Sequence, residues 1–463
     1  MIKNQPQHLV KLTVGQRIPL TIKRLGINGE GIGYYKHKIV FVTGALPGEV
    51  VVAEITQIAK RFASAKIHRI RQKSPDRVTK RDQYDVGGIE LEHLAYPKQL
   101  EFKRDIVKQA LKKYRPTGYK SYQLRPMLGM SEPYYYRNKA QFQVRKVNDR
   151  VIAGLYRRGS HQLVDLPTFS TQRPATMKVM RQLCRIIEEL QLPVYDEKQA
   201  AGIIKTLIVR ESMATGQVQV TIVTNSEKFI QQRSFVERVI HDLPEVVSLM
   251  QNYNPGKTSL IWGKKTKRLY GQQQITEKIA DKKYQLSAQA FFQLNSAQTL
   301  KLYQAIADAL NLTGKENLID AYCGAGTIGI YLADQVAQVR GMDIIPAAIA
   351  DARQNAKLNH CFNTHYECGK AEQIIPHWQK MGFAADAIVV DPPRTGLDRK
   401  LISSIIQSKI KKLVYVSCNP STLARDLVWL ARKYRIAYLL PIDMFPQTAR
   451  IEVLVKLSLR TDD

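Results

Sequence analysis

The sequence predicts an α/β protein whose C-terminal part, residues 281–463, folds as a doubly wound and mainly parallel sheet. From about residue 299, apolar strand-like segments alternate regularly with helical segments. The expected strands are 317–321, 338–342, 387–390 and 413–417, and motifs rich in glycine or polar residues follow them. Ligands bind at the carboxyl ends of the strands in such sheets, so we expect the functional site at that edge.

Residues 8–72 predict a small β-barrel, because short strands are separated by glycine and proline turns. Strands are expected at 14–25, 39–42 and 49–58, with a glycine-rich turn at 26–33. Residues 73–280 mix the two kinds of element and predict a central α+β domain. A helix is expected at 99–114 and a strand at 217–223.

The charge balance predicts a polyanionic partner. The chain has 70 Lys and Arg against 40 Asp and Glu, a net charge of +30. Residues 1–72 alone hold twelve basic and three acidic residues, and Lys36 and Lys38 lie beside two tyrosines. Cations beside aromatic rings suit phosphate contact and base stacking, and the same mixture recurs at Tyr134–Arg137 in the central domain. We therefore expect both modules to bind RNA, in preference to carrying a solvated basic face.

Other classes of protein are disfavoured. No long apolar span or basic amphipathic helix is present, so no membrane partner is expected. The first sixteen residues lack a signal-peptide core, which predicts a cytoplasmic protein. The five cysteines are odd in number and form no CxxC pair, which disfavours a disulfide framework or a zinc ribbon. Most of them are expected to be small buried hydrophobes.

The segment 320–332 reads DAYCGAGTIGIYL, a glycine turn between a strand and a helix. Gly324, Gly326 and Gly329 match GxGxxG, and glycine lets the backbone approach a ligand closely. Asp343 ends the next expected strand, where its carboxylate can accept hydrogen bonds from ribose hydroxyls. The pattern fits NAD and S-adenosylmethionine about equally, and its start, Asp-x-x-Cys-Gly, favours the methyl donor.

The segment 388–398 reads IVVDPPRTGLD and places Asp391 at a strand end, before a loop stiffened by two prolines. Such a loop can hold a flat substrate beside a donor methyl. Enzymes that methylate exocyclic amino groups usually have an aromatic residue after the prolines, whereas this chain has Arg394. The loop also lacks the cysteine that cytosine-5 RNA methyltransferases generally carry. These differences point to another chemistry.

Two further residues, a cysteine and a glutamate, indicate which chemistry the site performs. Cys418, in LVYVSCNPSTLARDL, lies between a strand and a helix start, where the helix dipole can favour a thiolate. Glu452 lies in or beside an apolar strand, where a carboxylate is costly unless it is functional or paired with Arg450 or Arg425. A thiolate that adds to carbon 6 of uracil makes carbon 5 nucleophilic, and a base must later remove the carbon 5 proton. Cys418 and Glu452 can supply these roles.

Together these motifs resemble the RNA (uracil-5)-methyltransferases that carry an N-terminal TRAM domain. The resemblance spans nearly the whole chain and includes GIIKTLIVRES at 202–212, AQAFFQLNSAQT at 288–299 and the motifs above. It implies a Rossmann-like class I methyltransferase domain, an OB-like TRAM barrel at 8–72 and an α+β RNA-binding domain at 73–280. It also implies donor contacts from Gln293, Tyr322, Asp343 and Asp391, with Cys418 as the nucleophile and Glu452 as the base.

The sequence departs from many of these relatives in two places. Relatives often bind an iron–sulfur cluster through cysteines around a Gly-Gly pair, but here Val86 and Ile89 flank the pair and Phe169 replaces a later cysteine. We therefore expect no cluster and apolar packing instead. Relatives also often have His two residues before the catalytic Glu, where this chain has Arg450.

The resemblance implies a 23S rRNA substrate of Gram-positive type, and a T-loop uridine of tRNA is the alternative. The chain is expected to act as a monomer. Two readings from other classes remain: a non-catalytic RNA-binding factor, which Cys418 and Glu452 disfavour, and an NAD-linked oxidoreductase. The oxidoreductase reading leaves the cysteine, the DPPR loop and the charge of +30 unexplained.

Overall fold

The structure is a computed structural model that describes residues 12–460. Its internal contacts divide the chain into two compact units. The first unit combines residues up to Gln83, Gly88–Ile106 and Phe445–Arg450, and the second holds the remainder. The predicted borders at 72/73 and 280/281 stay predictions. Residues 8–11, 461–463 and most of the N-terminal segment read for a signal peptide lie outside the described residues.

The first unit contains a single six-stranded sheet with the order β1-β5-β6-β4-β3-β2. Alternating side chains of these strands point into a closed apolar core, as the pattern of RIPLT in β1 shows. The strands are β1 (Arg17–Thr21), β2 (Arg24–Leu25), β3 (Gly31–Tyr35), β4 (Lys38–Thr43), β5 (Val50–Ile58) and β6 (Phe62–Gln72). The expected strands at 39–42 and 49–58 are confirmed, and the one expected at 14–25 is divided into two.

The glycine-rich segment 26–33 was expected to be a turn, and this expectation is wrong for its second half, which forms β3. The reason is close packing of neighbouring backbone. A Cβ at Gly31 would lie 2.6 Å from the carbonyl oxygen of Ala45, and one at Gly33 would lie 3.1 Å from that of Thr21. The glycines therefore allow a strand to form where a side chain would not fit.

The first unit is stabilised by a buried ion pair between Glu49 and Arg77. The Glu49 carboxylate accepts hydrogen bonds from Arg77 Nε at 2.6 Å and Nη2 at 2.8 Å, and from the backbone N–H of Leu46 at 2.9 Å. Burial alone would raise the pKa of Glu49, but these hydrogen bonds and the guanidinium charge hold it below its ordinary value. Glu49 is therefore charged in the folded unit at neutral pH.

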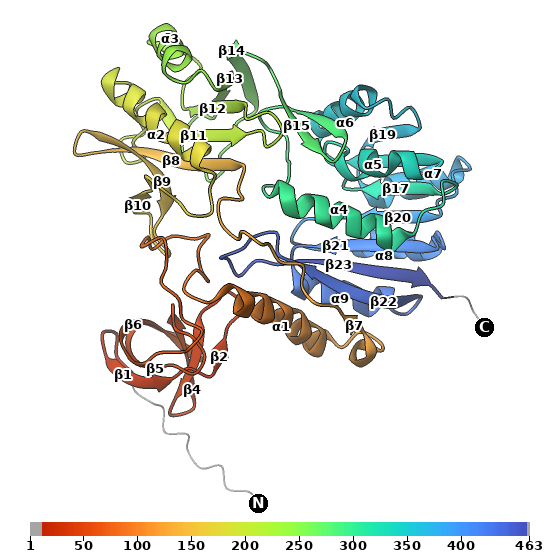
Figure 1. Cartoon of the computed structure of the whole chain (residues 1–463), viewed down its shortest axis with the longest axis horizontal. Coiled ribbons are helices and arrows are strands. Elements are labelled where there is room, and N and C mark those ends of the chain that lie inside the picture. Colours follow the sequence, from red (N-terminus) through yellow and green to blue (C-terminus); the bar gives the residue numbers. More distant parts are fainter. Residues whose placement is uncertain (1–11, 461–463) are drawn as a thin grey trace, which may run out of the picture. The chain divides into compact units, whose positions relative to one another are not determined.

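The second unit contains a seven-stranded sheet with the order β10-β9-β8-β11-β12-β13-β14. All its strands pair antiparallel except β12 and β13, which are parallel. Helices α2 (Pro174–Glu189) and α3 (Gln232–Asp242) lie along one side of it (Figure 1). The strands are β8 (Lys139–Val147), β9 (Arg150–Tyr156), β10 (Leu163–Asp165), β11 (Ile204–Glu211), β12 (Val218–Thr224), β13 (Val246–Tyr253) and β14 (Lys265–Gly271).

The largest sheet of the second unit has eight strands in the order β19-β18-β17-β20-β21-β23-β22-β7. The five strands β19, β18, β17, β20 and β21 are parallel to one another. Strand β23 lies between β21 and β22 and is antiparallel to both, and β7 pairs parallel with β22. The strands are β7 (Gln123–Leu124), β17 (Asn317–Ala321), β18 (Gln338–Asp343), β19 (Thr364–Cys368), β20 (Ala387–Val390), β21 (Lys412–Ser417), β22 (Tyr434–Ile442) and β23 (Glu452–Leu459). The predicted doubly wound sheet and its four expected strands are confirmed.

Helices cover this sheet, as Figure 1 shows. Contacts link α4 (Ser296–Leu310), α5 (Thr327–Leu332) and α6 (Pro346–Leu358) in one group, and α7 (Ala371–Lys380), α8 (Arg399–Gln407) and α9 (Pro420–Leu430) in another. The remaining elements are α1 (Tyr96–Tyr114), the hairpin β15 (Ile275–Ile279) and β16 (Lys282–Leu286), and the short 3-10 turns Tyr119–Ser121 and Ala333–Gln335. Within residues 12–460, no helix is both long enough and apolar enough to cross a membrane.

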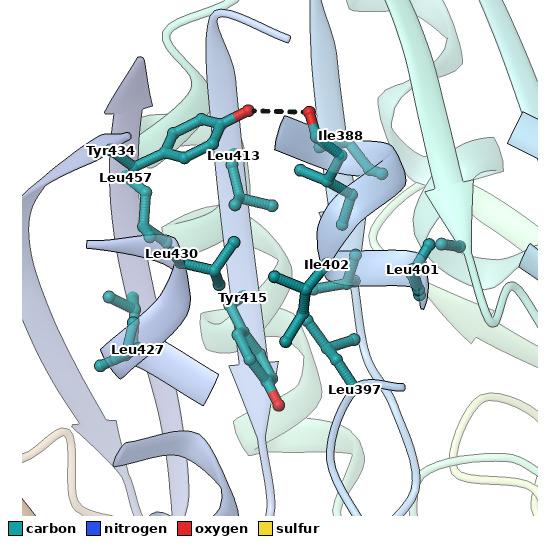
Figure 2. Packing of buried hydrophobic residues seen from close by; sticks show 14 of the residues in the cluster. Ile388, Leu397, Leu401, Ile402, Leu413, Tyr415, Leu427, Leu430, Tyr434 and Leu457 are labelled. Atoms are coloured by element: carbon teal, nitrogen blue, oxygen red, sulfur yellow. Dashed lines mark hydrogen bonds between the residues drawn. The ribbon is translucent and has the colours of Figure 1, made fainter. Parts of the chain in front are cut away.

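The core between this sheet and helices α7 to α9 fixes the strand ends that carry the site. Tyr415 of β21 is fully buried and packs among leucines and isoleucines of β20, α8 and α9 (Figure 2). Tyr434 donates its hydroxyl to the carbonyl oxygens of Ile410 at 2.9 Å and Ile405 at 3.3 Å. The hydroxyl of Tyr415 donates to Asp426 at 2.8 Å, so both of these buried tyrosine hydroxyls have a hydrogen-bond partner.

Candidate active site

The glycine turn after β17 has the geometry that its sequence predicts. Tyr322 and Gly324 both have a positive φ, of 65° and 53°, and Gly326 precedes α5 with a φ of 77°. Gly329 approaches the strand so closely that its N–H donates to Asp320 Oδ2 at 2.8 Å, and a Cβ there would lie 2.9 Å from a Val339 methyl group. The turn therefore presents backbone rather than side chains at the carboxyl end of β17.

Asp343 is held against this turn at the end of β18. Its Oδ2 accepts a hydrogen bond from the N–H of Gly324 at 3.0 Å, and its Oδ1 accepts one from the N–H of Ile345 at 3.0 Å. The carboxylate is half-buried, so the rest of its hydrogen-bonding capacity faces the cavity described below. This is the placement that the sequence predicts for a residue that accepts hydrogen bonds from a ribose.

A cavity of about 540 Å³ lies at the carboxyl edge of this sheet, which is within the usual size range for small-molecule sites. Its lining includes Tyr322 and Asp343, but neither Gln293 nor Asp391. The other lining residues follow the strand ends or lie on α8 and α9: Met342, Ile344, Gly369, Lys370, Ala371, Glu372, Pro393, Thr395, Gly396, Leu397, Asp398, Arg399, Ile402, Arg425, Asp426 and Trp429. Sequence reasoning missed Glu372 and Trp429, although Glu372 also follows a strand end.

Cys418 and Glu452 lie opposite each other at the same edge. Ser417 of β21 pairs with Val453 of β23 in an antiparallel register, Cys418 directly follows Ser417 and Glu452 directly precedes Val453, and the charge of Glu452 acts on Cys418. Glu452 is 5% exposed, and its Oε1 accepts no hydrogen bond. Within residues 12–460 the structure gives Glu452 no ion pair. Arg425, one of the two arginines considered as its partner, forms an ion pair with Asp426. The structure therefore does not show Glu452 as a structural residue held by a salt bridge.

The acidic groups around this pair raise one another's pKa values. Burial and the charge of Asp391 raise the pKa of Glu452 well above its ordinary value, while the Arg394 guanidinium lowers it. Burial raises the pKa of Asp391 to about 7. Burial, with the charges of Asp391 and Asp343, also raises the pKa of Asp320 to about 7, and its Oδ1 has no hydrogen-bond partner. Such an enclosed set of carboxyls suits a cationic ligand, which would favour their charged forms.

The pKa of Cys418 differs from the sequence-based expectation. Burial raises it to about 11, and the neighbouring carboxyls of Glu452 and Asp391 add to the increase. Arg394 is the group that lowers it. Burial and the neighbouring carboxyls therefore oppose the thiolate that the start of α9 at Pro420 was expected to favour.

Hydrogen bonds fasten the DPPRTGLD loop to the start of α9. The carbonyl oxygen of Arg394 accepts hydrogen bonds from Asn419 Nδ2 at 3.0 Å and from Thr422 Oγ1 at 3.3 Å. Asp426 is 1% exposed, and its Oδ2 accepts from the N–H of Leu397 at 2.8 Å. Because Asn419 directly follows Cys418, these contacts hold the cysteine and Arg394 in a fixed relation.

The remaining cysteines divide by position. Cys184, Cys323 and Cys361 are buried, so most of the cysteines are buried as expected, and Cys368 is exposed at the end of β19. Val86, Ile89 and Phe169, which stand where relatives have cluster-binding residues, are each no more than 2% exposed. No group of metal-binding side chains occurs between residues 12 and 460. The absence of an iron–sulfur cluster stays a prediction.

A doubly wound sheet with β23 inserted antiparallel, a glycine turn after β17 and a carboxylate at the end of β18 defines an S-adenosylmethionine-dependent methyltransferase. The residues fit this cofactor: the cavity is large enough, Asp343 is presented toward it, and the neighbouring carboxyls can accommodate a sulfonium. The sequence model of the tRNA (uracil-5-)-methyltransferase family matches residues 95–460, and that of the TRAM domain matches residues 11–68. The chain therefore belongs to this family of RNA methyltransferases, and S-adenosylmethionine is its methyl donor.

Individual relatives agree with this assignment. A protein of Lactiplantibacillus plantarum described as an "uncharacterized RNA methyltransferase" is 58% identical over 99% of this chain and 96% of its own length. One of Enterococcus faecalis with the same description is 54% identical over 98% of this chain and 99% of its own. The crystal structure of Pyrococcus abyssi tRNA (uracil-54, C5)-methyltransferase with S-adenosyl-L-homocysteine matches with a TM-score of 0.76 at 27% identity, covering 95% of this chain and 99% of that one.

Proposed function

We propose that the protein transfers the methyl group of S-adenosylmethionine to carbon 5 of specific uridines in 23S rRNA, through a covalent adduct with Cys418. The observation that carries this proposal is the register of β21 and β23, which sets Cys418 opposite the buried and unpaired Glu452. A nucleophile and a base on opposite strands can reach the two adjacent ring carbons of one uracil. The covalent route rests on this pair.

In the proposed reaction, the thiolate of Cys418 forms a bond to carbon 6 of uracil, and the electron pair of the 5,6 double bond moves toward carbon 5 and oxygen 4. Bound S-adenosylmethionine would supply the electrophilic methyl group, which carbon 5 takes while the bond from that methyl to the sulfonium breaks and S-adenosylhomocysteine is left as the product. Glu452 then removes the proton from carbon 5, the double bond re-forms and the bond to Cys418 breaks. The thiolate is recovered, and the proton lost by uridine is on Glu452.

Four residues are proposed to contact the donor. Tyr322 and Asp343 line the cavity, where the aspartate can bind the ribose of the adenosyl group. Asp391 lies two residues before Pro393, another lining residue, and its charge acts on both Cys418 and Glu452. Gln293 is half-buried in the segment before α4, and its carbonyl oxygen accepts a hydrogen bond from Asn138 Nδ2 at 3.1 Å.

The RNA target is supported by charge and by domain content. The net charge of +30 and the TRAM domain favour a large and highly charged substrate, and the motifs resemble those of enzymes that act on 23S rRNA. A tRNA uridine is the second candidate, because the solved relative from Pyrococcus abyssi acts on uracil 54 of tRNA and the family model bears the tRNA name. We propose a cytoplasmic monomer that binds RNA and no membrane.

Methyl transfer to unmodified 23S rRNA and to bulk unmodified tRNA, measured side by side with a labelled donor, tests the proposal. We expect label in 23S rRNA with the wild-type protein and none with Cys418→Ala, because the adduct cannot form. Cys368→Ala is the matched control, since that cysteine is exposed at another strand end, and it should retain activity. Label only in tRNA would overturn the proposed substrate and keep the chemistry, and label in neither RNA would overturn both.

The role of Glu452 is tested separately with Glu452→Gln. Addition of Cys418 and methyl transfer can proceed without the base, whereas elimination cannot, so a covalent protein–RNA complex should accumulate. The complex should survive denaturing electrophoresis and be absent from the Cys418→Ala, Glu452→Gln double variant. Normal turnover by Glu452→Gln would show that another group takes the proton.

A further inference from the structure

The seven-stranded sheet has two faces of different character. Alternate residues on one face are apolar, such as Ala140, Phe142 and Val144 of β8. The residues between them, which lie on the other face, are mainly polar, although Ile208, Val223 and Met250 also lie there. This polar face contains Lys139, Gln141 and Gln143 of β8, Arg210 and Thr206 of β11, Gln219 and Thr221 of β12 and Ser248 of β13.

Lys139 and Arg210 are direct partners across β8 and β11, so their side chains leave the sheet on the same side. Arg210 is 5% exposed, and its guanidinium donates to the carbonyl oxygen of Ala290 at 2.7 Å. Asn138, next to Lys139, donates to the carbonyl oxygen of Gln293 at 3.1 Å. The polar face therefore meets the segment that carries Gln293, one of the proposed donor contacts.

Lys139 has no counter-charge. The structure gives its ammonium no hydrogen bond and no ion pair anywhere in residues 12–460, although the side chain is half-buried. Burial, together with the charges of Arg210 and Arg137, lowers the pKa of Lys139 to about 7. The carboxylates of Glu277 of β15 and Asp351 of α6 act on Arg210 and raise its pKa, against the larger lowering effect of burial.

We infer that Lys139, with Arg137 and Arg210 beside it, forms a site for one phosphate group of the RNA backbone. Within the described residues Lys139 has no carboxylate partner, and Arg137 and Arg210 add positive charge beside it, so a phosphate group is a ligand of matching charge. This inference rests on the proposed function for the identity of the ligand as RNA. It adds a binding site on the central sheet that neither the motifs nor the comparisons assign.

Phosphate of RNA is favoured over the carboxylate of the methyl donor for two reasons. The cavity that fits the donor is lined by residues of the methyltransferase sheet and its helices, and none comes from the seven-stranded sheet. Exposed aromatic residues flank the cluster in sequence: Tyr135 is 44% exposed just before Lys139, and Phe291 is 68% exposed just after Ala290. Cations bordered by exposed rings suit a single strand of nucleic acid.

Equilibrium binding of labelled, unmodified transcripts of 23S rRNA and tRNA to the full-length protein tests this site. S-adenosylhomocysteine is present, so no methyl is transferred and binding is measured even if the proposed reaction is wrong. Because bound phosphate raises the pKa of Lys139, binding takes up a proton above pH 7, and affinity should fall about tenfold between pH 7 and 8.5. The Lys139→Arg variant should bind RNA as tightly at pH 7. Its affinity should not show this fall between pH 7 and 8.5, since arginine stays protonated.

Lys139→Gln should weaken binding about tenfold at pH 7 and reduce the slope of log affinity against log salt by about 0.7–0.9, the value for one phosphate contact. Lys178, on α2, has a side chain that is 73% exposed, and Lys178→Gln is the matched control. It should change neither the RNA affinity nor the salt slope. Wild-type affinity and salt slope in a folded Lys139→Gln protein would overturn the site. If Lys139→Gln lost affinity for S-adenosylhomocysteine and bound RNA normally, the site would also be overturned, because the anion that Lys139 binds would then be the carboxylate of the cofactor.

Discussion

Without a bound ligand, the residues at the carboxyl edge of the methyltransferase sheet have pKa values that favour their protonated and unreactive forms. Cys418, Asp391 and Glu452 all have raised pKa values because they are enclosed and because the two carboxyls repel further negative charge. Arg394 is the cation that opposes this effect on both Cys418 and Glu452. Reactivity should therefore depend on pH and on Arg394.

Single-turnover methyl transfer at saturating RNA should become faster as pH rises from 6 to 9. The pKa of Cys418 is about 11, so the thiolate fraction grows up to tenfold for each pH unit, and Glu452 shifts toward its basic form in the same direction. Arg394→Gln should move the profile to higher pH and slow the reaction about tenfold or more at pH 7.5. Arg435→Gln, exposed on β22, is the control, and a flat wild-type profile would contradict the assignment.

The sequence could indicate Cys418 and Glu452 because both stand at strand ends beside apolar runs. It could not indicate their pKa values, since these depend on groups that the fold brings together, such as Asp391. Lys139 shows the same limit. Its sequence context predicts RNA contact in general, but its burial opposite Arg210 follows only from the pairing of β8 with β11.

At the scale of elements, Asp426 joins three parts of the site. Its Oδ2 accepts hydrogen bonds from the N–H of Leu397 and from the hydroxyl of Tyr415, both at 2.8 Å, and its Oδ1 accepts from Arg425. The loop after β20, strand β21 and helix α9 are thus fixed to one buried carboxylate. Gly396 makes this possible, because a Cβ there would lie 2.5 Å from Asp426 Oδ2.

Asp426→Asn should lower kcat/KM for methyl transfer by about tenfold to a hundredfold, because an amide cannot accept all of these hydrogen bonds and the loop that carries Arg394 shifts. Affinity for S-adenosylhomocysteine should fall as well, because Asp426 and Leu397 line the cavity. Asp308→Asn is the matched control: that residue is exposed on α4 and does not line the cavity. Equal effects of the two substitutions on kcat/KM would contradict a positioning role for Asp426.

The elements that periodicity predicts best are those of the methyltransferase sheet. Strands β17 and β20 match the expected 317–321 and 387–390, because a buried parallel strand is a continuous apolar run between polar ends. Strand β6 was not predicted, since its outer half, KIHRIRQ, is polar and mostly exposed. Strand β7 was not predicted either, because two residues carry no period.

For the molecule as a whole, acid stability should depend on carboxylates that the fold holds in their charged form. Glu316 accepts hydrogen bonds from Lys412 Nζ and the N–H of Thr313, both at 2.8 Å. Burial would raise its pKa, but these contacts lower it to about 2. A lowered folded-state pKa means that the stabilisation is present above about pH 4.5 and is lost as pH falls toward 2.

Glu316→Gln should therefore lower the free energy of unfolding by about 1–2 kcal/mol at pH 7, as measured by urea denaturation. The difference from wild type should shrink as pH falls below 4, because the wild-type carboxylate then takes up a proton. Glu101→Gln, an exposed member of a pair with Lys98, should have no such effect. A constant difference at all pH values would show that the charge of Glu316 is not the cause.

The organisation of the whole chain was the hardest feature to predict. The three consecutive domains that composition and periodicity indicate stay a prediction, and the contacts show that Phe445–Arg450 belongs to the unit of the TRAM sheet. Nothing in the local pattern of that segment identifies its unit. Its neighbours in space lie far away in sequence, as Gln447 shows by accepting a hydrogen bond from Gln99 at 2.8 Å.

Strand β7 has a consequence for the order in which the protein folds. Gln123 pairs with Tyr438, so the edge of the methyltransferase sheet is completed by a segment made long before the strand that it joins. Closing so long a loop is entropically costly and slow, and it can occur only after β22 has formed. Until then the outer edge of β22 is open to strands of other chains, which makes refolding at high protein concentration prone to aggregation.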